Sequence, residues 1–131
     1  MGLSLDRTGT LRLRLGEADV SLHFRRPEPA ELIETLARKM PRGEEAADAS
    51  RALLANLELG RRCVEGVGEG ELTVGGAPLA TDPDAGEFHK DWREILAAAA
   101  PLLLIALGQF LSAPPAFLSE PALKKTSATP G

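Results

Sequence analysis

The sequence predicts an α+β domain in which an N-terminal antiparallel β-hairpin packs against about three α-helices. Two patterns carry this prediction. Apolar and polar residues alternate with period two up to Arg25, and after Pro27 the apolar residues recur every three to four positions. The length of 131 residues suits one domain, and the apolar and charged fractions of 44% and 26% are those of a globular protein. We assign residues 1–113 to a single α+β domain and expect residues 114–131 to form a flexible, disordered tail.

The hairpin is predicted from two alternating segments, residues 10–15 and 20–25, which are separated by turn residues at 16–19. Successive side chains of a strand point to opposite faces, so each segment places three apolar residues on one face. These are Leu11, Leu13 and Leu15, followed by Val20, Leu22 and Phe24. A lone hairpin is marginally stable in water, so the apolar face must pack on helices. A further edge strand is expected at Leu3 and Leu5.

Three helices are expected after the hairpin. Pro27 and Pro29 end the strand and open the first helix, because proline suits a first helical turn. The second helix is expected from about Glu44 to Val64, and the third begins near Glu87. Pro101 kinks or splits the third helix, because proline lacks an amide hydrogen and clashes with the preceding turn. The first apolar stripe consists of Leu32, Ile33, Leu36 and Met40.

Between the second and third helices, the segment Glu71–Val74 is expected to be a short strand, followed by a turn at Gly75-Gly76. The periodicities also predict a core. Its expected buried members are Leu13, Phe24, Leu36, Leu53, Trp92 and Leu103.

Composition disfavours several classes of function. The net charge is −4 and no cluster of Lys and Arg exceeds a pair, whereas a nucleic-acid binder usually presents a basic stripe. The single cysteine, Cys63, permits no intramolecular disulfide, and a reducing cytoplasm is the natural location. Cys63 lies in a helix rich in Leu and Ala and is expected to be an inert buried thiol.

No cofactor, metal or catalytic site is expected. The glycines of segment 66–70 follow a helix and precede a strand, the reverse of a dinucleotide fingerprint. His23 and His89 have no acid or thiol partners at metal-ligand spacing, so both are expected at the surface. No pocket of converging polar groups is indicated, and we therefore expect a protein that is not an enzyme.

The stretch from Ile95 to Ser119 carries no charge, and uncharged apolar runs of about 18 or more residues are candidates for membrane spans. Here Pro101, Gly108 and Gln109 interrupt the run, and without it the domain would lose its largest core element. A buried helix is the favoured interpretation. A membrane anchor formed by residues 95–118 stays open as an alternative.

The order of elements is similar to that of the tail assembly chaperones of long-tailed bacteriophages and prophages. The segment Arg26–Leu32 resembles the Arg-Pro-x-x-x-Glu-Leu start of that family's first helix. Val67 and Thr126 depart from the usual Trp and Asn of the family. Further resemblances lie at Cys63–Gly66, Gly75–Pro78, Pro101–Leu103 and Leu123–Ser127.

This resemblance implies a non-enzymatic helper in the host cytoplasm, which binds the helical tape-measure protein and tail-tube subunits during tail morphogenesis. The predicted partner surface lies on the extension of the third helix, which has more apolar faces than one small core can use. It consists of Leu104, Leu107, Phe110 and Leu111. Such a surface predicts homo-oligomers in the absence of the partner. The alternatives are a structural tail component retained in the particle and the membrane-anchored accessory protein.

Overall fold

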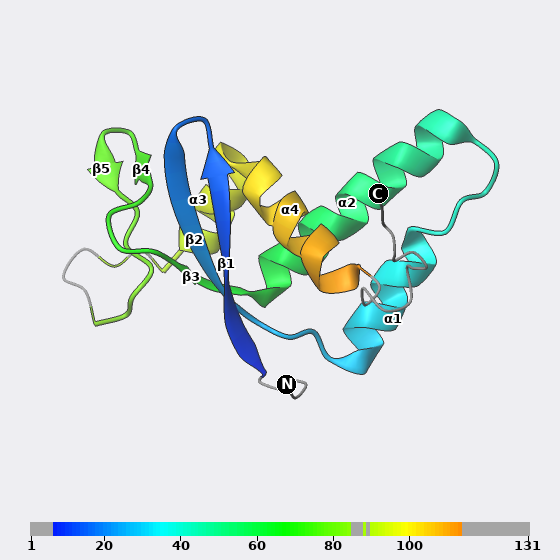
Figure 1. The fold of residues 1–131 in the computed structure, drawn as a ribbon, viewed down its shortest axis with the longest axis horizontal. Helices are drawn as coiled ribbons and strands as arrows, with labels where there is room; N and C mark the ends of the chain where they lie inside the picture. The colour runs from blue at the N-terminus through cyan, green and yellow to red at the C-terminus, as the bar shows by residue number, and fades with distance from the viewer. Residues whose placement is uncertain (1–6, 85–87, 89, 114–131) are drawn as a thin grey trace, which may run out of the picture.

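A computed structural model describes residues 7–84, 88 and 90–113, and it has the α+β fold that the sequence predicts (Figure 1). Strands β1 (Thr8–Leu15) and β2 (Ala18–Arg25) pair antiparallel along their full length. Two residues connect them, and Gly16 takes a φ of 67°, which only glycine adopts freely. The strand expected at Leu3 and Leu5, His89 and the expected tail lie outside the described residues.

A third strand, β3 (Val64–Val67), pairs antiparallel with β2, so the strand order is β1-β2-β3. The sequence pattern did not predict this strand, because four residues are too few to show alternation and Val64 also fits the preceding helical stripe. The expected strand near Thr73 is confirmed as β4 (Thr73–Val74). It pairs with β5 (Ala77–Pro78) across the predicted Gly75-Gly76 turn.

The helices are α1 (Pro29–Arg38), α2 (Glu45–Cys63), α3 (Trp92–Ala99) and α4 (Pro101–Ser112). Pro101 splits the expected third helix, and α3 and α4 are bent by 100° relative to each other. The expected helix start near Glu87 is wrong, because Phe88 forms a β-bridge with Ala80 instead. In Figure 1, α1 and the first half of α2 extend away from the sheet, on the side of the molecule opposite β4 and β5.

The core joins β2 and β3 to α2, α3 and α4, and its fully buried side chains include Leu22, Leu59, Leu104 and Leu107. Helices α2 and α4 run antiparallel and their backbones touch. A Cβ atom on Gly60 would lie 2.0 Å from the Leu104 carbonyl oxygen, and one on Gly108 would lie 1.9 Å from the Asn56 carbonyl oxygen. The two glycines therefore allow α4 to lie directly on α2.

Four of the six residues expected in the core lie there wholly or in part. Phe24, Trp92 and Leu103 are buried, and Leu13 is half-buried. The expectation is wrong for Leu36 and Leu53, which are 43% and 52% exposed. Both lie on the α1–α2 arm that extends away from the sheet (Figure 1). Their apolar sides therefore stay in solvent.

Candidate protein-binding surface

The four residues predicted to bind a partner do not form one exposed surface. Leu104 and Leu107 are fully buried and Leu111 is 8% exposed, so these three side chains belong to the core. The reason is that α4 packs against α2 on one side and contacts the sheet on another. Only Phe110 is exposed, at 46%, and its ring packs edge-on against Phe24 with centroids 5.8 Å apart.

Among the described residues, a row of exposed apolar side chains lies instead on α1. Ile33, Leu36 and Met40 are 67%, 43% and 65% exposed. Their spacing of three and four residues places them on one side of the helix, where Met40 follows just beyond its last residue. We call these three residues the α1 stripe. Periodicity predicted these three residues together with Leu32, which is half-buried, and the expected burial of Leu36 is wrong.

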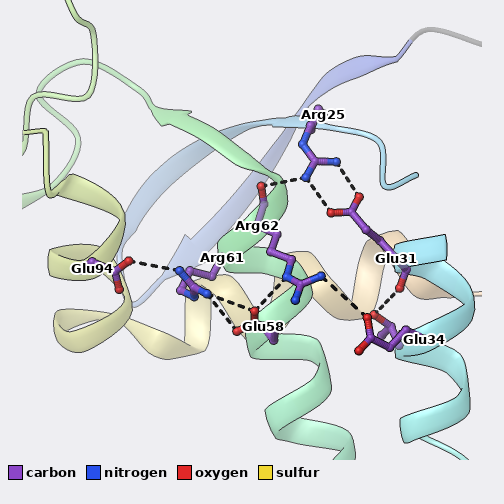
Figure 2. Close-up of polar contacts among 8 residues, drawn as sticks. Arg25, Glu31, Glu34, Glu58, Arg61, Arg62 and Glu94 are labelled. Carbon is purple, nitrogen blue, oxygen red and sulfur yellow. Dashed lines mark hydrogen bonds and ion pairs between the residues drawn. The ribbon is translucent and has the colours of Figure 1, made fainter. Parts of the chain in front are cut away.

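Helix α1 is attached to the rest of the domain by polar contacts on its other sides, as Figure 2 shows for one of them. The Arg25 guanidinium donates two hydrogen bonds to the Glu31 carboxylate, at 2.8 and 2.9 Å. This bidentate pair is well shielded, with 29% and 18% of the two side chains exposed. Hydrogen bonds from Arg25 lower the pKa of Glu31 to about 2. Glu31 also accepts the Glu28 amide at 2.8 Å, which closes the first turn of α1.

A chain of charges then links three helices (Figure 2). Arg62 of α2 lies 3.9 Å from Glu34 of α1 and donates to Glu58 at 2.9 Å. Arg61 bridges Glu58 and Glu94 of α3, at 3.1 and 3.2 Å. Exposed ion pairs contribute little to stability one by one, and a connected series does more to fix orientation. These contacts hold the polar side of α1 toward α2.

The C-terminal end of α1 is held against α4 by a second polar cluster. Lys39 Nζ donates to Ser112 Oγ at 2.8 Å and to Gln109 Oε1 at 3.2 Å. Asn56, which is buried on α2, donates to the same Gln109 oxygen at 3.0 Å. Burial lowers the pKa of Lys39. The side of α1 that meets the domain body is therefore polar, while its apolar side is exposed.

The connection from α1 to α2 is also ordered by side chains. Asp48 accepts the backbone amides of Arg42, Gly43 and Glu44 at 3.0 to 3.1 Å. Arg51 donates to Asp48 at 2.6 Å and to the Met40 carbonyl at 3.2 Å. The chain around Met40 is thereby fixed. Beyond this turn, α2 exposes Leu53 and Leu54, at 52% and 57%.

The other candidate groups have local structural roles in the part of the chain that the structure describes. Cys63 is fully buried, and burial raises the pKa of its thiol. His23 is exposed, and its Nδ1 lies 3.0 Å from Thr10 Oγ1. Among the described residues, no group of three or more His, Cys, Asp or Glu is placed to hold a metal ion. A hollow beside the β4–β5 hairpin is lined by Val74, Ala77, Pro78, Leu79 and Ile95.

Two further findings bear on identity. Within the described ranges no single helix has the length and apolarity to cross a membrane, whereas the bent pair α3 and α4 meets both criteria together. Comparison of the chain with family models, with curated proteins and with solved structures finds no match.

Proposed function

We propose that this chain is a non-enzymatic tail assembly chaperone of a long-tailed phage or prophage. In this proposal it binds an amphipathic helix of the tape-measure protein with the α1 stripe and also binds tail-tube subunits. The exposed stripe is the observation that carries the binding part. The resemblance of the sequence to the chaperone family supplies the identity of the partner.

The size and shape of the stripe favour a helix as the occupant. Ile33, Leu36 and Met40 follow helical spacing, which matches the ridges of another helix laid against them. They expose an apolar area of a few hundred Å², while a standard stable interface buries about 800 Å² on each partner. Each contact is therefore weak. A long helix with a repeated apolar stripe compensates by binding many copies side by side.

The orientation of α1 also supports a binding role. A surface helix normally turns its apolar stripe inward. Here the inward side carries Glu31 and Lys39, each of which has a defined polar partner. An exposed apolar stripe on a helix held in this way is typical of a protein-binding surface.

A synthetic amphipathic helix tests the binding part directly. The probe is a 28-residue fluorescent peptide (about four heptads) with Leu at helical spacing, and a scrambled peptide of the same composition is the control. Ile33→Asp combined with Met40→Asp should abolish the change in anisotropy while circular dichroism stays unchanged. Leu102→Asp is the matched control, because Leu102 is equally exposed, at 68%, but lies on α4. Binding that survives in the double variant, or is lost in Leu102→Asp, would contradict the assignment.

The family part has a separate test. A tail assembly chaperone should be encoded next to a very long, helical tape-measure protein, and a gene neighbourhood without one would count against it. Mass spectrometry of purified particles distinguishes a chaperone, which is absent from them, from a structural tail component, which is present.

A further inference from the structure

In the part of the chain that the structure describes, β1 forms an outer edge of the three-stranded sheet. Its ladder with β2 runs over the whole strand without a bulge, and the strand contains no proline. Proteins often protect an edge strand with a bulge, a proline or charged side chains, because its unpaired backbone can bind another strand. Of these three protections β1 has charge alone, in Arg12 and Arg14.

The ladder identifies the backbone groups that face the free edge. The Arg26 amide donates to the Arg7 carbonyl oxygen at 2.6 Å, which marks a hydrogen-bonded pair of residues. Such pairs alternate with non-bonded pairs along an antiparallel ladder, so the odd-numbered residues of β1 bond to β2. The even-numbered residues direct their N–H and C=O groups away from β2, at intervals of roughly 7 Å. These exposed residues are Thr8, Thr10, Arg12 and Arg14.

The two faces of the sheet beside this edge suit different side chains in a bound strand. On one face Leu11 and Leu13 are half-buried and pack on the core, so apolar residues next to them would extend the core. On the other face Arg14 lies 3.5 Å from Asp19 in a loose ion pair. Among the described residues the Arg12 side chain has no such contact. Carboxylates of a bound strand would pair with both guanidinium groups.

We propose that the free edge of β1 binds an extended segment of another protein, antiparallel to β1, in which acidic residues alternate with apolar ones. Backbone hydrogen bonds supply the affinity of such a strand, and its alternating side chains supply the specificity. Charge selects against a second copy of the chain, because another β1 would bring two more arginines onto the same face. This edge is separate from the α1 stripe, and neither proposal depends on the other.

Amide hydrogen exchange, measured by NMR on the full chain, tests the contact. The probe is the peptide Val-Glu-Val-Glu-Val-Thr-Val-Thr, which places its glutamates opposite Arg12 and Arg14 when it pairs antiparallel. Without the peptide the amides of Thr10, Arg12 and Arg14 should exchange fast. With the peptide at about ten times its Kd, their exchange should slow roughly 10-fold. The amides of Leu11 and Leu13 bond to β2 and should be protected equally in both conditions.

Matched changes in the peptide and in the protein separate strand pairing from charge attraction. N-methylation of the two glutamates blocks the amides that face β1 and should abolish binding, whereas N-methylation of the two inner valines should not. Arg12→Glu should weaken binding about 10-fold and should favour a peptide with lysine in place of glutamate. Arg42→Glu makes the same change of charge at an exposed position outside the sheet and should leave binding unchanged.

Three results would overturn this proposal. Binding that survives N-methylation of the glutamates would show attraction without pairing. Slow exchange at Arg12 in the absence of peptide would show that the edge is already covered, by a second copy if dilution restores fast exchange and by the same molecule if it does not. Exchange that millimolar peptide leaves unchanged would show that the arginines only protect the edge. Because none of these readings involves the α1 stripe, they leave the test of the proposed function separate.

Discussion

Gly108→Ala tests the packing that buries the predicted partner residues. At an open helical position this substitution stabilises a protein by about 1 kcal/mol, because alanine has the higher helix propensity. In this structure the added Cβ would lie 1.9 Å from the Asn56 carbonyl oxygen and 2.6 Å from its carbon. Both are backbone atoms of α2, so no side-chain rotation relieves the clash. The two helices would have to move apart along their whole contact.

Overpacking of this kind costs about 1–3 kcal/mol or more, and the gain in propensity offsets only part of it. We expect Gly108→Ala to lower the free energy of unfolding by about 2 kcal/mol, which corresponds to a fall of roughly 8–16 °C in Tm. Urea denaturation measures the free energy of unfolding and a thermal melt measures Tm, both followed by circular dichroism. Ser50→Ala, at an exposed position of α2, is the control and should stabilise slightly. A Gly108→Ala variant as stable as the wild type would refute the close crossing of α2 and α4.

Three further predictions follow from the same contacts. Leu107→Asp should unfold the domain, because it buries an unpaired charge, whereas Phe110→Asp should leave the circular dichroism spectrum unchanged. Glu31→Gln should cost about 1–2 kcal/mol in urea melts at pH 6. That difference should vanish toward pH 2, because the pKa of Glu31 falls from 4.5 to about 2 on folding and the stabilisation is lost as pH falls through this window. Deleting residues 120–131 should leave Tm within about 1 °C, since the segment is rich in Ser, Thr and Lys; a larger fall would show that it is docked.

Local signals made the hairpin and the helices predictable. The alternation over β1 and β2 and the turn at Gly16 lie within 18 residues of one another, and Pro29 and Pro101 open α1 and α4. Strand β3 was not predictable in this way, because its pairing depends on a distant segment: His23 lies opposite Gly66. A four-residue strand carries too little pattern of its own.

The candidate site was harder to predict, because an apolar stripe in a sequence can pack in the core of its own domain or bind a partner, and the pattern is the same in both cases. On α4 the sequence showed more apolar faces than a small core needs, and the surplus was assigned to a partner. Gly60 and Gly108 were the residues in the sequence that could have indicated the close packing of α4 on α2. Because glycine has no side chain, two helices can approach closely there, and more of the apolar surface of α4 becomes buried. On α1 the stripe was found, but Leu36 was assigned to the core, although the domain body meets a different side of the helix.

Polar contacts on the other side of α1 fix the outward orientation of the α1 stripe. Turning the stripe toward the body of the domain would require α1 to rotate about its own axis. It would also break the bidentate Arg25–Glu31 pair and take Lys39 away from Ser112. The buried Ser112 hydroxyl would then lose a charged donor, and the shielded Glu31 carboxylate would lose its guanidinium partner, so the loss of both contacts opposes such a rotation. The polar contacts thus hold the stripe in solvent, where a helix from another protein can reach it.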